Sequence, residues 1–308
     1  MYYPLLRSKK YECSALIELL TQNKLSKNII PIIEPVKANQ PFKALLKQFF
    51  EDKREIAVVQ NSSVANYNSF NEEEINKIKL SDMFINAYNL KSDEDVNRIK
   101  DKNKKTMVIL TDKSELSNIE QFSNDKSLVV IDVNNRIEIR KAKNNSVKNL
   151  IELSDGYDKK ERNLDYVDDA DQSFSIEHLL YKNDGFLGFS DYSIVGDNFS
   201  TGGSFPKVVA IHIVYFNKNN ELRIHHFTSD PKDSESKDLK LKNGEALEKL
   251  VSWYDSKNFD KSKNDSLGLR ELRNVYVNKH GETNLGKLKQ FSIEHHLEII
   301  GRYLDNNE

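Results

Sequence analysis

Four carboxylate residues, each at the end of a short apolar run, are the first candidates for chemistry in this sequence. They are Glu34, Asp132, Asp155 and Asp191. Carboxylates that face one site can hold a hard divalent cation or divide general acid and base roles between them. We therefore predict that Glu34, Asp155 and Asp191 are catalytic and that all four carboxylates bind Mg²⁺ or Mn²⁺ as cofactor. The alternative is that each carboxylate caps a following helix by accepting backbone N–H hydrogen bonds.

Basic and polar residues at similar places suit a phosphate group. Arg7 and Lys37 follow the first two apolar runs, and their charge would offset both the carboxylates and a bound phosphate. The other candidate ligand-binding residues are Asn61, Tyr192, Gly202 and Gly203. The two glycines belong to the stretch STGGSF, whose backbone N–H groups could cradle a phosphate; a plain turn is the alternative. No Gly-Lys-Ser/Thr follows, which excludes a Walker loop.

Histidines gather late in the chain. They are His212, His225, His226, His280, His295 and His296. No two of them have the four-residue spacing of a helical zinc site, and the single cysteine offers no second ligand. We expect packed or hydrogen-bonded histidines, with His212 as the candidate catalytic one, since histidine is the commonest general base.

The elements that would position these residues have the pattern of a parallel sheet. Eight short runs recur at 2–7, 28–35, 55–61, 83–89, 105–111, 127–133, 149–157 and 185–193. Several are continuously apolar, which is typical of strands covered on both faces. Helical patterns fall between them at 9–22, 41–52, 92–101 and 112–123. We predict an α/β fold, an irregular (β/α)8 TIM-like barrel whose strand ends gather at one mouth, with its irregularity at the poorly periodic connection 134–147.

A different pattern begins after Gly203. The runs 208–216 and 221–230 alternate around the turn NKNN, which predicts an antiparallel β-hairpin. Helical patterns follow at 243–255 and 284–306, and a polar loop separates them. We predict a barrel over residues 1–205 and a C-terminal hairpin with helices over residues 206–308, packed together as one compact unit.

Composition excludes several classes of protein. The chain has 308 residues, 31% of them charged, a net charge of -2 and one cysteine. Its mean hydropathy is -0.66, and no apolar run approaches the ~20 residues of a membrane helix. The first residues lack the pattern of a secretory signal, and a lone cysteine forms no internal disulfide. We expect a cytoplasmic protein without a membrane partner, and the net charge gives no global basic field for nucleic acid.

Six longer motifs carry a resemblance to a known family. They are MYYPLLRSKKYECSALIELL, IIPIIEPVK, DGYDKKERNLDY, EHLLY with GFLGFSDYSIVG, VVAIHIVYF with LRIHHF, and LGKLKQFSIEHHLEIIGRYL. Together they resemble the bacterial and phage "beta protein" family, and most closely its short branch, over essentially the whole chain. Genes of that branch typically travel on mobile elements beside a partner that resembles a restriction-type nuclease.

The resemblance implies a TIM-barrel-like core with a C-terminal elaboration. The positions that match the family pattern are Arg7, Glu12, Glu34, Lys37, Asn61, Asp155, Asn163, Tyr166, His178, Asp191, Tyr192, His212, His226, His295 and His296. The sequence departs from the family near the third strand, where QNSSVANYNS lacks the usual Asn-Pro and nearby Gly. A role for that loop is therefore not carried over.

Two functions follow as hypotheses. The resemblance implies an accessory protein of phage defence or of a mobile element, which binds a nucleic acid, a nucleotide or a partner nuclease at the barrel mouth. The alternative is a metal-dependent phosphodiesterase or nuclease, in which the strand-end carboxylates hold the metal and a metal-bound water attacks the phosphorus. A structural partner with no small-molecule site is the third possibility.

Overall fold

The structure is a computed structural model that describes residues 1–62, 64, 72–99, 104–197 and 205–307. The chain forms two compact units, each built from several segments. The first comprises Met1–Cys13, Lys27–Asp155 and Glu177–Tyr192, and the second comprises Ser14–Ser26, Gly156–Ile176 and Ser193–Glu308. Of the described helices, none is long and apolar enough to span a membrane.

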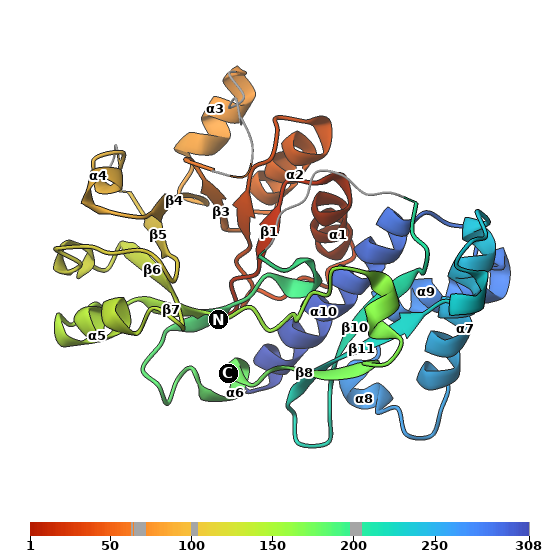
Figure 1. Ribbon diagram of the computed structural model, residues 1–308. Helices are drawn as coiled ribbons and strands as arrows, with labels where there is room; N and C mark the ends of the chain where they lie inside the picture. Colours follow the sequence, from red (N-terminus) through yellow and green to blue (C-terminus); the bar gives the residue numbers. More distant parts are fainter. Residues whose placement is uncertain (63, 65–71, 100–103, 198–204, 308) are drawn as a thin grey trace. The chain divides into compact units, whose positions relative to one another are not determined.

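An eight-stranded parallel sheet forms the first unit, and it confirms the predicted α/β barrel. Its strands, in order, are β1 (Leu5–Arg7), β2 (Ile32–Glu34), β3 (Ile56–Val59), β4 (Phe84–Leu90), β5 (Thr106–Leu110), β6 (Ser127–Asp132), β7 (Leu150–Leu153) and β9 (Gly188–Ser190). Each strand lies within one of the eight runs predicted from the sequence, apart from Leu90, one residue beyond its run. Figure 1 shows the helices α2 to α5 on the outer side of this sheet.

Backbone hydrogen bonds join the last strand to the first. The N–H of Tyr3 donates to the carbonyl of Phe189 at 2.9 Å, and the N–H of Leu5 donates to that of Asp191 at 2.8 Å. Gly188 lies at this seam, and a Cβ there would overlap the carbonyl oxygen of Met1 and the ring of Tyr3. A residue without a side chain is therefore needed for the strands to approach.

Alternate residues of the eight strands fill the barrel interior. This cluster includes Leu5, Ile32, Ala57, Val59, Ile85, Ala87, Met107, Ile109, Leu128, Val130, Ile151 and Leu153. Because side chains alternate between the two faces of a strand, the next inward position along each strand lies at the C-terminal end of the barrel, its mouth.

The described helices of the chain are mostly short. They are α1 (Lys10–Thr21), α2 (Gln40–Glu51), α3 (Glu73–Leu80), α4 (Asp93–Val96), α5 (Arg136–Asn144), α6 (Glu177–Leu180), α7 (Leu239–Tyr254), α8 (Lys261–Asn264), α9 (Leu267–Lys279) and α10 (Leu285–Asn307). Short 3₁₀ turns add η1 (Glu120–Phe122), η2 (Asn163–Tyr166), η3 (Ser193–Val195) and η4 (Pro231–Asp233).

Two connections of the barrel differ from their predictions. The segment 112–123 forms only the 3₁₀ turn η1 instead of a helix. The connection 134–147 contains the regular nine-residue helix α5 instead of an irregular segment. Asn135 begins α5 by accepting a hydrogen bond from the N–H of Glu138, and a strong cap of this kind compensates for weak apolar periodicity.

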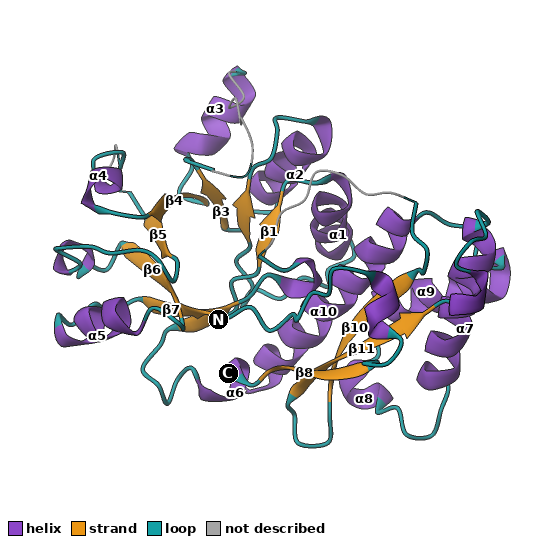
Figure 2. Cartoon of the chain, in the orientation of Figure 1, coloured by secondary structure: helices purple, strands orange, loops and turns teal. Residues whose placement is uncertain are grey.

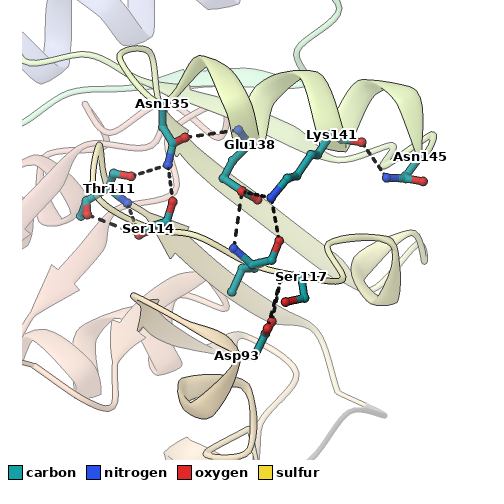
Figure 3. A network of polar contacts seen from close by, with 9 residues as sticks. Asp93, Thr111, Ser114, Ser117, Asn135, Glu138, Lys141 and Asn145 are labelled. Atoms are coloured by element: carbon teal, nitrogen blue, oxygen red, sulfur yellow. Dashed lines mark hydrogen bonds and ion pairs between the residues drawn. The ribbon is translucent and has the colours of Figure 1, made fainter.

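A polar network connects the loops at the mouth that follow β5 and β6 (Figure 3). The side-chain amide of Asn135 donates to the carbonyls of Thr111 and Ser114, both at 2.8 Å. Glu138 is fully buried and accepts a hydrogen bond from Lys141 Nζ at 2.7 Å. This network fixes the rim of the mouth on this side of the barrel.

The second unit contains a three-stranded antiparallel sheet in the order β10-β11-β8 (Figure 2). Strands β10 (Ala210–Phe216) and β11 (Leu222–Thr228) form the predicted hairpin, and β8 (Asp171–Ser175) adds a strand that the sequence did not suggest. Because β8 precedes residue 205 but pairs with β11, the second unit begins well before the boundary predicted at residues 205/206.

One face of this sheet packs against helices α7, α9 and α10. The shared core includes Ile211, Ile213, Phe227, Leu247, Leu250, Leu269, Leu272 and Phe291. The segment 255–266, predicted as a polar loop, contains the short helix α8, which starts at the side-chain cap Asp260. The opposite face of the hairpin combines buried apolar residues, among them Val214 and Ile224, with His212 and His226.

Replacement of Asn135 tests the rim network. Asn135→Ala would remove the side-chain partner of one buried carbonyl, one partly buried carbonyl and one helix N–H, so we expect the free energy of unfolding to fall by about 2–3 kcal/mol. Urea denaturation followed by circular dichroism measures this change. The matched control is Asn134→Ala, an exposed neighbour, for which we expect a change within about 0.5 kcal/mol. Equal effects of the two variants would contradict a structural role for the network.

Candidate functional site

Arg7, Glu34 and Asn61 are brought together at one side of the barrel mouth. Arg7 and Glu34 are the inward-facing residues that follow Leu5 and Ile32 on their strands, and both are buried. Arg7 Nε lies 4.0 Å from Glu34 Oε2, and the Arg7 N–H donates to Glu12 Oε2 at 2.6 Å. Asn89 reaches Glu34 Oε1 at 3.4 Å. The charge of Glu34 is therefore offset within the protein by a neighbouring guanidinium.

Asn61 acts at this rim as a connector between strands. Its side chain donates to the carbonyl of Asn89 at 2.7 Å and accepts from the N–H of Asn89 at 2.8 Å. Both polar ends of the amide are thus used to extend the pairing of β3 with β4. Asn61 serves the loop geometry in this structure and has little capacity left for a ligand.

Asp132 and Asp155 lie at the ends of the adjacent strands β6 and β7. Both continue the inward alternation of their strands, since Val130 and Leu153 line the interior. Asp132 accepts hydrogen bonds from the backbone and side chain of Asn134 at 2.8 and 3.0 Å, and Asp155 is exposed. Glu34 belongs to β2, which is adjacent to neither of these strands in the sheet. Within the described residues, no three His, Cys, Asp or Glu side chains are grouped to hold a metal.

Asp191 points away from the barrel interior, unlike the other predicted carboxylates, which take inward-facing positions on their strands. Ser190 and Tyr192 continue the inward alternation, and Tyr192 packs against the interior cluster. Asp191 is buried and accepts a hydrogen bond from the Tyr2 hydroxyl at 2.6 Å. Burial and the nearby Asp191 carboxylate raise the pKa of Tyr2 well above its usual value. This geometry indicates a structural contact for Asp191.

The other predicted phosphate ligands are not gathered with Arg7 in a described site. Lys37 is exposed, and its backbone carbonyl accepts a hydrogen bond from Ser8 Oγ at 3.4 Å. Gly202 and Gly203 lie outside the described residues. The mouth therefore presents a buried ion pair and two adjacent carboxylates in place of a single cluster.

His212 belongs to a cluster of polar and aromatic side chains on the face of the hairpin opposite Ile211 and Ile213 in the second unit. It lies directly opposite His226 in the register of β10 and β11, and the two Nδ1 atoms are 2.7 Å apart. Because Ile211 and Ile213 face the helical core, alternation turns His212 to the other side of the sheet. His226 is buried and His212 partly buried.

Two tyrosines cover the histidine pair. The ring of Tyr166 lies 4.3 Å from that of His226 and 4.9 Å from that of His212, measured between centroids. Tyr157 and Tyr166 are 2.9 Å apart at their hydroxyls, and the Lys160 N–H donates to the Tyr166 hydroxyl at 2.8 Å. The four side chains form a continuous aromatic and polar cluster.

Gly156 explains how the chain reaches this cluster. A Cβ at this position would overlap the carbonyl oxygen of Phe174 in β8, so only glycine allows the segment to pass so close to the sheet. The next residue, Tyr157, is thereby placed over His212 with a centroid distance of 5.3 Å.

A cavity of about 240 Å³ opens beside His212. Its lining is Tyr157, Lys159, Lys160, Asn163, Tyr166, Ile194, Val195, Ala210, Ile211, His212, Leu285, Leu288, Lys289 and Ser292. Three of these residues are lysines, and none of the described lining residues is acidic. Asn163 is held by a hydrogen bond to the carbonyl of Val208 at 2.8 Å. We name this the His212 cavity.

Both histidines of the pair are neutral at pH 7. Burial lowers the pKa of His226 from 6.5 to about 4, with a further contribution from His225. Burial, then repulsion from His226 if both rings were protonated, and the positive charges of Lys289 and Lys159 hold the pKa of His212 well below its usual value. A hydrogen bond between two Nδ1 atoms requires that one of them carries a proton and the other does not.

Burial decides which histidine donates. His226 Nε2 is buried and has no hydrogen-bond partner among the described residues. An orphaned buried N–H is rarer in proteins than an orphaned acceptor, so we infer that His226 carries its proton on Nδ1 and donates to His212 Nδ1. His212 then carries its proton on Nε2, its remaining polar atom, and offers the cavity a hydrogen-bond donor; its predicted catalytic role stays a prediction.

The remaining late histidines have structural partners. His295 Nδ1 lies 2.8 Å from Ser266 Oγ, and His295 Nε2 lies 2.6 Å from the carbonyl oxygen of Val214. His296 Nδ1 lies 2.8 Å from Ser193 Oγ. These contacts confirm the prediction of hydrogen-bonded histidines for this helix.

Sequence reasoning on single residues missed most of the His212 cavity. Tyr157, Lys160 and Lys289 were not candidates, because no spacing rule connects residues 157–166 with the hairpin or with α10. The signal that was present is the motif DGYDKKERNLDY, which supplies Gly156, both tyrosines and two of the lysines.

The depressed histidine pKa values predict how stability changes with pH. Because the pKa of His226 is about 4 in the folded protein and 6.5 in the unfolded chain, the unfolded chain binds more protons between these values. Stability should fall as the pH falls through this window, with up to about 3 kcal/mol from His226. Thermal melts of the wild type and His226→Asn from pH 7 to pH 4 should show a smaller loss in the variant.

The control for this experiment is His280→Asn. His280 is exposed and has a left-handed backbone conformation that asparagine tolerates. This variant should keep the pH dependence of the wild type. A pH dependence in His226→Asn equal to that of the wild type would show that the pair is not held neutral.

Comparisons of the chain with models of protein families, with curated proteins and with solved structures find no match. The resemblance to the beta protein family therefore rests on the sequence motifs and stays a prediction.

Proposed function

We propose that the protein binds a nucleotide, or a nucleotide unit of a nucleic acid, with its phosphate in the His212 cavity. The observation that carries the proposal is the lining of this cavity, in which Lys159, Lys160 and Lys289 occur without any acidic residue among the described lining. Lys160 also pairs with Asp158 and Asp169, two carboxylates outside the lining. Several cationic and N–H donors around one cavity favour an anion with several acceptor oxygens. The inferred Nε2–H of His212 adds a donor of the same kind.

The rest of the lining suits the uncharged part of a nucleotide. Tyr157 and Tyr166 contribute aromatic surface, and Asn163 contributes a polar side chain at the rim. The apolar side is formed by Ile194, Val195, Ala210, Ile211, Leu285 and Leu288. A site with an apolar wall and a few convergent polar groups is the usual form of a small-molecule site.

The biological setting of the proposal comes from the sequence resemblance. We place the protein as an accessory component of phage defence or of a mobile element, acting beside a nuclease-like partner. Binding of a nucleotide unit would give such a component a means to detect nucleic acid or its fragments. A pull-down of the tagged protein with the product of the adjacent gene tests this partnership.

Binding of nucleoside monophosphates tests the proposed site. We expect isothermal titration calorimetry to detect binding of at least one of AMP, GMP, CMP and UMP, and Lys289→Gln to weaken it by roughly tenfold, because a charge-assisted hydrogen bond contributes about 1.5–3 kcal/mol. The matched control is Lys287→Gln on the same helix, whose Nζ contacts Gln290 and the Phe291 ring instead of the cavity. Absence of binding by all four nucleotides, or equal losses in both variants, would reject the site.

Metal-dependent phosphodiester hydrolysis is the second candidate function. One observation favours it: Asp132 and Asp155 take inward positions at the ends of adjacent strands. Carboxylates so placed suit Mg²⁺ or Mn²⁺, with water and substrate oxygens completing the coordination.

Titration with metal ions tests this second candidate. If the two aspartates bind a metal, MnCl₂ should produce heat on titration and raise the melting temperature of the wild type by a few degrees, as mass action predicts for any ligand of the folded state. Asp155→Asn should lose both effects. Asp125→Asn, an exposed aspartate paired with Lys148, is the control that should keep them. No heat and no shift in the wild type would remove the candidate.

A further inference from the structure

A second, larger cavity shares a wall with the His212 cavity. Its volume is about 640 Å³, and its lining is Glu161, Arg162, Asn163, Leu164, Phe205, Pro206, Lys207 and Val208. Asn163 lines both cavities. The two cavities therefore adjoin at Asn163. We name this the Phe205 cavity.

Phe205 is presented in this cavity by a buried lysine. Phe205 is 49% exposed, although large aromatic side chains usually bury most of their surface. Lys242 is completely buried, and its Nζ donates to the carbonyls of Pro206 and Ser234 at 3.1 and 3.0 Å. The same Nζ lies over the Phe205 ring, 5.2 Å from its centroid. The backbone beside Phe205 is thus fixed, and the ring stands as a supported, half-open aromatic surface.

The charges of the Phe205 cavity favour an anion. Arg162 and Lys207 face one carboxylate, Glu161, in the lining. Lys207 also pairs with Glu235 at 3.5 Å, but both side chains are highly exposed, and such surface pairs contribute little and exchange easily. Within the described part of the chain, Arg162 makes no ion pair. Two cations beside an exposed aromatic ring resemble the sites that bind successive phosphates and stack a base.

We propose that the two cavities form one track for single-stranded nucleic acid. A phosphate binds the lysines and His212 in the first cavity, the chain passes Asn163, and the next base stacks on Phe205 with its phosphate near Arg162 and Lys207. A duplex does not fit this arrangement, because its bases are already paired and stacked, whereas an unpaired base can enter a cavity. This inference rests on the proposed function and deepens it by naming the strand as the ligand.

Comparison of short and long ligands tests the track. We expect the hexanucleotides dT₆ and rU₆ to bind at least tenfold more tightly than TMP or UMP by calorimetry, because each stacked base contributes about 1–3 kcal/mol. Phe205→Ala should weaken binding of the hexanucleotides by roughly fivefold or more and leave binding of the monophosphates unchanged. Phe50→Ala, a similarly exposed phenylalanine at 42% on α2, is the matched control and should alter neither.

The outcomes separate this inference from the proposed function. If monophosphates bind in a Lys289-dependent manner but hexanucleotides bind no more tightly, or lose nothing in Phe205→Ala, the track is rejected and the phosphate site stands. If no nucleotide of either length binds, both proposals fall. Equal binding of hexaglutamate would also overturn the track, because it would show attraction by charge without stacking. A preference between dT₆ and rU₆ identifies DNA or RNA as the strand.

Discussion

Hydrogen bonds between the first and last strands of the barrel are the interactions on which its geometry depends. Tyr3 and Leu5 pair with Phe189 and Asp191, and this pairing joins β9 to β1. Once the ring is joined, alternation gives every strand one inward row of side chains, and the row continues to the mouth. That single constraint decides that Tyr192 points inward and Asp191 points away.

In the second unit, the small sheet buries a pair of histidines on the face opposite its helical core. One face packs against three helices, while the other holds two histidines that burial keeps neutral, beside the buried apolar residues Val214 and Ile224. A shared proton satisfies both Nδ1 atoms at once, so the pair tolerates an environment in which two charged imidazoles would repel each other. The tyrosines then screen the pair from solvent and form part of the wall of a cavity whose described lining includes three lysines and no acidic residue.

Apolar runs in the sequence predicted all eight barrel strands, because buried parallel strands need continuous apolar character on both faces. The helix α5 escaped prediction since its start depends on the cap at Asn135 more than on periodicity. Strand β8 escaped because DQSFS has almost no β-branched or apolar character. Whether Asp191 faces inward or outward could be predicted only after the inward-facing positions were known. A shift of one residue along a strand moves every side chain to the other face. The His212 cavity required contacts between segments more than 40 positions apart, which local patterns do not encode.

The interleaved order of β7, β8 and β9 also has a consequence during synthesis on the ribosome. Asp171 of β8 is synthesised 54 positions before its partner His225 of β11. In contrast, both neighbours of β9 in the barrel, β7 and β1, are synthesised before β9 itself. The barrel can therefore close while β8 is still an unpaired edge in the nascent chain. Unpaired apolar strand edges promote aggregation. Because β8 is polar, it can stay solvated until the hairpin strands have been synthesised.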